Sequence, residues 1–158
     1  MSAPDIVLVD DEKDVRLSYA QSLELAGFQV RALERAETAL GLLGPTFPGI
    51  LVSDIRMGGM DGMTLLSRVR SIDSELPTVL VTGHADMALA VRAMREGAYD
   101  FIEKPFPPRL LVEVATRALD RRRLVLENRR LRAATHREDG IETRLLGRNR
   151  AIADLRHR

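Results

Sequence analysis

Four short apolar runs in this chain each end on polar residues that could bind or accept a phosphoryl group. Residues 6–9 lead into Asp10 and Asp11, residues 50–53 into Asp54, residues 79–81 into Thr82, and residues 101–103 into Lys104. The carboxyl ends of parallel strands lie along one edge of a sheet, so these side chains are expected to meet in one crevice. The four runs therefore predict a phosphoryl-handling site at a sheet edge.

The expected site is rich in carboxylates. Asp10, Asp11 and Asp54 would raise one another's pKa unless a cation lay between them. The chain has no cysteine and only three histidines, so oxygen ligands and Mg²⁺ are expected. With the metal bound, one carboxylate could attack phosphorus and form an aspartyl phosphate. Lys104 would then supply a second positive charge and Thr82 a hydroxyl donor.

Each of these residues also has a simpler structural interpretation. The two adjacent aspartates could cap a helix, Asp54 could begin a turn, and Thr82 and Lys104 could belong to exposed loops. Lysine is rare in this chain, however, because 22 of the 24 basic residues are arginine. A lysine at position 104 favours a role that needs a compact ammonium group. The shared position at strand ends favours the functional interpretation.

Strand and helix patterns alternate along residues 1–120. Further strands are expected at 28–33 and 99–103, and helices at 14–26, 36–43, 63–71, from Asp86 to Gly97, and from Pro107 onward. Five strand and helix pairs with short connections predict an α/β fold with a doubly wound, five-stranded parallel sheet. No run is long enough to cross a membrane. We therefore expect a cytoplasmic protein without membrane contact.

The C-terminal third differs in charge and length of helix. Residues 1–105 contain 10 basic and 16 acidic residues, whereas residues 106–158 contain 14 and 7. The last helix is expected to run to a flexible joint at 138–140. Leu124, Asn128 and Leu131 have coiled-coil spacing, which favours a linker helix that pairs in a homodimer. Direct binding of nucleic acid by the arginines is the alternative.

The chain resembles the receiver domain of two-component response regulators over residues 4 to about 120. The motifs that carry this resemblance are VDDE at 9–12, SDIRM at 53–57, MDG at 60–62, VTGH at 81–84 and EKPF at 103–106. The resemblance implies a flavodoxin-like or CheY-like fold with strand order 2-1-3-4-5. It also implies that a sensor histidine kinase phosphorylates Asp54. Asp11 and Asp54 would bind Mg²⁺ directly, Asp10 through water, and Arg56 through its backbone carbonyl.

The same resemblance implies further features around the site. Phe101 stands where the family has an aromatic switch, and the Lys104-Pro105 bond is expected to be cis. Arg56 and His84 occupy positions that tune acyl phosphate hydrolysis in the family, although we favour solvated side chains there. Gly58 replaces a usual proline, so we expect a looser loop with reduced metal affinity or order.

The tail resembles NtrC-type sigma-54-dependent regulators, and among them the C4-dicarboxylate transport regulators. We assign residues 1–120 to the receiver, 121–139 to a helical linker, and 140–158 to the start of an AAA+ activation domain. No G-x-x-x-x-G-K-[ST] motif is present, so no ATPase activity is expected of this chain. We interpret it as an N-terminal fragment of a transcription factor. DNA and sigma-54 RNA polymerase would be contacted only through further domains.

Two other function classes were weighed. A phosphatase of the haloacid dehalogenase type also forms an aspartyl phosphate, but it needs an acidic residue where Arg56 stands. A dinucleotide-binding domain needs a G-x-G-x-x-G motif that is missing after the first strand. We therefore expect a phosphoacceptor switch with only slow self-phosphorylation and autodephosphorylation, rather than an enzyme.

Overall fold

The computed structural model of the chain describes residues 3–146, with side chains described through residue 135. Contacts divide the chain into two compact units, Met1–Arg123 and Leu124–Arg158. No helix of the described part is both long enough and apolar enough to cross a membrane. The predicted sites all lie in the first unit, except the three proposed linker residues.

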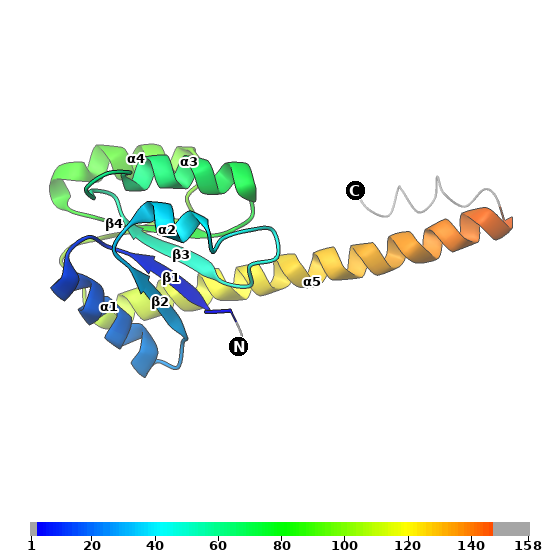
Figure 1. Cartoon of the computed structure of the whole chain (residues 1–158), viewed down its shortest axis with the longest axis horizontal. Coiled ribbons are helices and arrows are strands. Elements are labelled where there is room, and N and C mark those ends of the chain that lie inside the picture. The colour runs from blue at the N-terminus through cyan, green and yellow to red at the C-terminus, as the bar shows by residue number, and fades with distance from the viewer. Residues whose placement is uncertain (1–2, 147–158) are drawn as a thin grey trace. The chain divides into compact units, whose positions relative to one another are not determined.

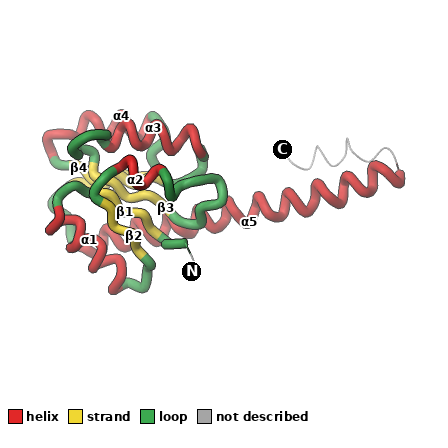
Figure 2. The backbone as a smooth tube through the Cα atoms, viewed as in Figure 1, coloured by secondary structure: helices red, strands yellow, loops and turns green. Residues whose placement is uncertain are grey.

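The first unit is built on one parallel sheet with strand order β2-β1-β3-β4-β5, which confirms the predicted fold class. Its strands are β1 Ile6–Val9, β2 Val30–Leu33, β3 Ile50–Asp54, β4 Thr78–Thr82 and β5 Asp100–Glu103. The helices are α1 Lys13–Leu25, α2 Ala36–Leu40, α3 Gly62–Ile72, the single 3-10 turn η1 His84–Asp86, α4 Met87–Arg95 and α5 Pro108–Leu146. Figure 2 shows this alternation of strands and helices along the chain.

Helices cover both faces of the sheet. In Figure 1, α1 and the first turns of α5 lie on one face, and α2, α3 and α4 lie on the other. Every residue of β1, β3 and β4 is buried, as expected for strands that pack on both sides. Apart from Thr78 at the start of β4, these central strands are apolar until they reach the polar residues at their carboxyl ends.

Two glycines end helices as the sequence predicted. Gly27 follows α1 with a φ of 101° and Gly97 follows α4 with a φ of 108°, a left-handed conformation that favours glycine. An added Cβ at position 97 would also lie 2.3 Å from Cζ of Arg70, so the flexible Arg70 side chain would have to shift.

Some element boundaries differ from the prediction. β2 begins at Val30 rather than at residue 28, and α2 ends at Leu40 rather than at residue 43. The joint expected at 138–140 is wrong, because α5 continues through Gly140 to Leu146. A single glycine costs a helix only about 1 kcal/mol relative to alanine, which neighbouring helix formers can offset. Most of the proposed activation-domain start lies outside the described residues.

Arg122 is a fully buried charge within the first unit. Its side chain has 0% exposure and forms a salt bridge to Asp73 at 3.0 Å. The same guanidinium donates to four backbone carbonyl oxygens, those of Phe47, Glu75, Gly44 and Pro45. These bonds join α5 to the loops that precede β3 and β4. Arg122 therefore packs as part of the core rather than as a solvated linker residue.

Candidate functional site

Neighbouring strands of the sheet present the predicted site residues at one edge. Asp54 and Thr82 are the last residues of β3 and β4, while Asp10 and Lys104 directly follow β1 and β5. The register pairs are Val9 with Ser53, Asp54 with Val81, and Thr82 with Glu103. The backbone N–H of Lys104 also donates to the carbonyl of Thr82 at 2.8 Å. The strand ends therefore meet, as the crevice argument predicted.

A partly buried ion pair lies at the centre of this edge. Nζ of Lys104 donates to Oδ2 of Asp54 at 3.0 Å, and the Asp54 side chain is only 8% exposed. Burial lowers the pKa of Lys104, but the hydrogen bond and charge of Asp54 outweigh it, so the pKa is raised. Lys104 is thus held charged beside Asp54. The Lys104-Pro105 bond is cis, as the resemblance implied.

Asp10 is buried and only partly satisfied. One carboxylate oxygen accepts from the N–H of Glu12 at 2.9 Å, while Oδ2 is buried without a hydrogen-bond partner. Burial raises the pKa of Asp10 to about 6. The hydrogen bond from the Glu12 N–H opposes this rise, and the charge of Asp54 adds to it. An orphaned carboxylate oxygen of this kind would be stabilised by a cation.

Asp11 is turned toward a loop. Its Oδ2 accepts from the backbone N–H of Gly58, in the loop after β3, at 2.9 Å. Among the side chains described, no group of three or more acidic, histidine or cysteine residues is arranged to hold a metal ion. The three aspartates lie along one edge, but their carboxylates do not converge in this arrangement.

The donor set nevertheless fits a hard divalent cation. Asp10, Asp11 and Asp54 offer carboxylate oxygens, and one of those oxygens is buried without a partner. Oxygen ligands of this type suit Mg²⁺. Binding would require Asp11 to leave or share its present hydrogen bond.

Thr82 ends β4, the strand between β3 and β5, and Phe101 lies in β5 three residues before Lys104. Thr82 is fully buried, and its hydroxyl donates to the carbonyl of Gly83 at 3.1 Å. Phe101 is half-buried and packs against the cluster of apolar residues formed by α3, α4 and β4. Its ring therefore fits the core interpretation in this arrangement, and the switch role stays a prediction.

Two side chains expected to be merely solvated have partners. Arg56 pairs with Asp86 at 2.8 Å although its side chain is 74% exposed. His84 contacts Glu103 at 3.0 Å. Asp86 is the N-cap residue of α4 but makes no side-chain capping hydrogen bond. Its carboxylate accepts a hydrogen bond from Arg56. These pairs link the loops after β3, β4 and β5.

Gly62 allows the loop after β3 to close tightly on Asp54. Its N–H donates to the carbonyl of Ile55 at 2.8 Å. A Cβ at this position would lie 2.5 Å from the backbone oxygen of Asp54. Asp61 caps α3 by accepting from the N–H of Thr64 at 2.8 Å. The MDG motif therefore fixes the backbone that carries Asp54.

Tyr19 is a neighbour of the site that sequence reasoning missed. Its ring packs against that of Phe106, with the ring centroids 5.4 Å apart. Burial raises the pKa of Tyr19. The positive charge of Lys104 opposes this rise, whereas the negative charges of Asp10 and Asp54 add to it. Periodicity alone gives the buried face of a helix but not its height relative to the sheet edge.

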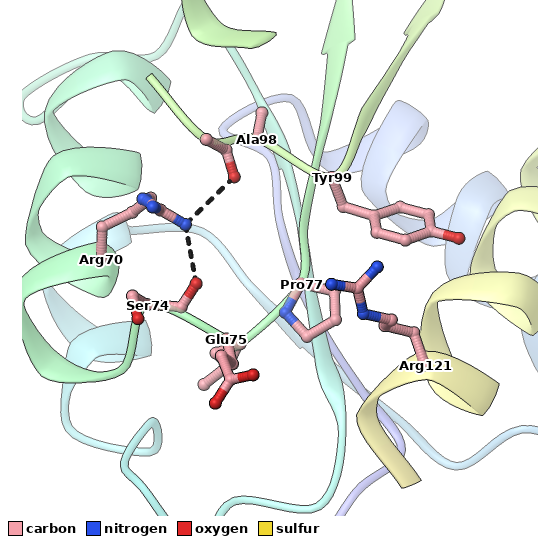
Figure 3. Close-up of a pocket in the computed structure, with 9 residues that line it drawn as sticks. Arg70, Ser74, Glu75, Pro77, Ala98, Tyr99 and Arg121 are labelled. Carbon is pink, nitrogen blue, oxygen red and sulfur yellow. Dashed lines mark hydrogen bonds between the residues drawn. The ribbon is translucent and has the colours of Figure 1, made fainter. Parts of the chain in front are cut away.

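A separate cavity of about 260 Å³ lies at the opposite, amino-terminal edge of the sheet. Figure 3 shows Arg70 on one side of it and Arg121 with Tyr99 on the other. Arg70 donates to the carbonyls of Ser74 at 2.7 Å and Gly97 at 3.4 Å, which joins α3 to the turn before β5. This cavity contains none of the predicted site residues.

Comparison with family models and curated proteins agrees with this geometry. The response regulator receiver domain model matches residues 6–116. The C4-dicarboxylate transport transcriptional regulatory protein DctD of Rhizobium meliloti (strain 1021) is 47% identical over 98% of this chain and 34% of its own length. DctD of Pseudomonas aeruginosa is 47% identical over 96% of the chain and 33% of its own length. The chain thus spans about a third of these relatives.

A solved structure gives the same result. The crystal structure of the receiver domain of NtrX from Brucella abortus is 42% identical, with a TM-score of 0.69. The match covers 73% of this chain and 98% of that domain. The fold is therefore shared with a known receiver domain.

Proposed function

We propose that Asp54 accepts a phosphoryl group from a sensor histidine kinase. The premise is that this chain belongs to the response regulator receiver domain family and is a receiver of the NtrC and DctD type. The observation that carries this proposal is the buried Asp54 carboxylate held 3.0 Å from the ammonium of Lys104. Asp54 has little access to water, and it lies at the edge where the four other strands of the parallel sheet also end.

The side chains at this edge suit phosphoryl transfer. An oxygen of Asp54 attacks phosphorus, and the bond from phosphorus to the kinase histidine breaks. Lys104 then shifts its hydrogen bond to an oxygen of the transferred group, where it neutralises charge. Thr82 would exchange its bond to the Gly83 carbonyl, 3.1 Å long, for a bond to a second phosphoryl oxygen.

Mg²⁺ is the cofactor that these residues fit. Asp11 and Asp54 would bind it directly, Asp10 through water, and Arg56 through its backbone carbonyl. The ion would supply positive charge that lets a phosphoryl group approach several carboxylates. The partnerless oxygen of Asp10 supports this assignment, since a cation and its waters would satisfy it.

Phosphorylation would act through a two-state rearrangement. Movement of Thr82 toward the phosphoryl group would open space into which the half-buried Phe101 rotates, changing the surface of α4, β5 and α5. Such a switch responds only as far as phosphorylation distinguishes the two states. Comparing Phe101 rotamers with and without beryllofluoride tests this step, and an unmoved ring would refute it.

The readout would be dimerisation through the linker helix, assigned to residues 121–139. Leu124 and Leu131 are 69% and 57% exposed in the single chain, which supports an apolar seam together with Asn128. Residues 140–158 would begin an AAA+ domain whose activity the dimer controls. The intact cytoplasmic regulator would reach DNA and sigma-54 RNA polymerase through domains outside this chain.

The phosphatase alternative gains no support. The comparisons indicate a receiver of the NtrC and DctD type. The position two residues after Asp54 holds Arg56, whose guanidinium pairs with Asp86 and cannot act as a general acid or base near neutral pH. The chain would therefore show only slow self-phosphorylation from small donors and slow loss of the group.

Acetyl phosphate with Mg²⁺ tests this function. Intact-protein mass spectrometry should show the gain of one phosphoryl group, dependent on Mg²⁺ and strongly reduced in Lys104→Met. Lys13→Met is the matched control, because Lys13 is the only other lysine and is exposed. Release of many phosphates per chain would instead indicate a phosphatase. Light scattering with and without beryllofluoride then tests whether the dimer responds to the switch.

A further inference from the structure

One hydrogen bond at the site is not explained by the proposed phosphoryl transfer. The backbone N–H of Gly58 donates to Oδ2 of Asp11 at 2.9 Å. Asp11 follows β1 and Gly58 lies in the loop after β3, so the bond joins two loops across the site. It uses the carboxylate that the proposed function assigns to direct Mg²⁺ binding.

The bond matters because it engages an ionised group. Hydrogen bonds to charged acceptors are stronger than bonds between neutral groups. While Asp11 is bound in this way, no three carboxylates in the described part of the chain form a metal-binding group. A cation that enters the site must therefore displace the Gly58 N–H from Asp11 or share the carboxylate with it.

We propose that the backbone N–H of Gly58 competes with Mg²⁺ for the carboxylate of Asp11, and so lowers the affinity of the receiver for the metal. This inference rests on the proposed function, because it takes Asp11 as a metal ligand. It replaces the simple expectation of a looser loop at Gly58 with a specific contact. The effect depends on the N–H and not on the missing side chain.

The surroundings of Gly58 allow the N–H and the side chain to be tested separately. The φ of Gly58 is not positive, and an added Cβ would lie 3.8 Å from Oδ2 of Asp11, an ordinary contact. Gly58→Ala therefore stiffens the loop and keeps the donor. Gly58→Pro also stiffens the loop but removes the donor. The pair separates competition from loop order.

Isothermal titration of the wild-type, Gly58→Ala and Gly58→Pro chains with MgCl₂ measures the affinity directly. We expect Gly58→Pro to bind Mg²⁺ about tenfold more tightly than wild type, from the net worth of one hydrogen bond. Gly58→Ala should stay within about twofold of wild type. Equal gains in both variants, or no gain in Gly58→Pro, would overturn the proposal.

A second readout uses the wild-type chain alone, so it does not depend on how the variants fold. In ¹⁵N NMR spectra, the amide proton of Gly58 should lose its hydrogen-bonded shift as MgCl₂ is added. An unchanged shift in a chain that does bind Mg²⁺ would refute the competition but leave the proposed function intact. Failure of the wild-type chain to bind Mg²⁺ at all would overturn both.

Discussion

The substitution Arg122→Met tests whether the buried guanidinium holds the first unit together. The side chain has 0% exposure, and Asp73, its salt-bridge partner, is only 4% exposed. Removing one member of a buried ion pair costs about 3–5 kcal/mol, because the buried charge of Asp73 loses its salt-bridge partner and keeps only its other contacts, which include the N–H of Glu75. Four backbone carbonyl oxygens also lose a donor. We therefore expect the free energy of unfolding to fall by about 4 kcal/mol.

Urea unfolding followed by tyrosine fluorescence measures this effect. The chain has two tyrosines, Tyr19 and Tyr99, and both lie in the first unit, so the signal reports that unit. With an m-value of about 2 kcal/mol per molar urea, the midpoint should fall by about 2 M. The adjacent Arg121→Met is the matched control, because Arg121 is exposed and its loss should cost less than about 0.5 kcal/mol.

A double variant refines the same prediction. Adding Asp73→Asn to Arg122→Met removes the buried charge that has lost its salt-bridge partner, so stability should recover by about 1 kcal/mol or more relative to the single variant. If Arg122→Met costs no more than Arg121→Met, the guanidinium does not support the core and the reasoning is refuted.

Two further predictions concern the site. Burial raises the pKa of Asp10 from 3.8 to about 6, so its charged form destabilises the fold, and the cost develops as pH rises through this range. Asp10→Asn should therefore stabilise the metal-free chain by about 3 kcal/mol at neutral pH, because each pKa unit of the shift corresponds to about 1.4 kcal/mol. The gain should fade as the pH falls from 6 to 4 in thermal unfolding, and a gain that grows there would contradict the burial argument. Gly62→Ala should destabilise the chain by about 2 kcal/mol, since its Cβ would lie 2.5 Å from the Asp54 carbonyl oxygen. Gly44→Ala is the control, because a Cβ added at Gly44 would have no atom within 4 Å. Equal urea midpoints for the two variants would contradict the steric argument.

The sequence predicted the sheet and the edge that carries the candidate site because those features depend on local patterns. Apolar runs of strand length, each followed by a polar residue, place Asp54 and Thr82 at strand ends wherever the sheet is parallel. The glycine stops at Gly27 and Gly97 depend only on φ. These signals are carried by residues close together in the chain.

The contacts that the sequence missed depend on packing between distant segments. Arg122 stands between two other arginines, and nothing in the sequence distinguishes this buried arginine from its exposed neighbours. The pairing of Arg56 with Asp86 joins residues 30 positions apart, and the bond from Gly58 to Asp11 spans 47. Such contacts depend on how far each loop extends beyond the edge of the sheet, and the periodicity of the sequence does not predict that distance.

The central claim is that Asp54 is the residue that receives the phosphoryl group. After phosphorylation with acetyl phosphate and Mg²⁺, borohydride reduction converts an aspartyl phosphate to homoserine, and peptide mass spectrometry locates it. The account predicts homoserine at position 54 alone, and no conversion in Asp54→Asn. Conversion at another aspartate in the wild-type chain, or undiminished labelling of Asp54→Asn, would contradict it.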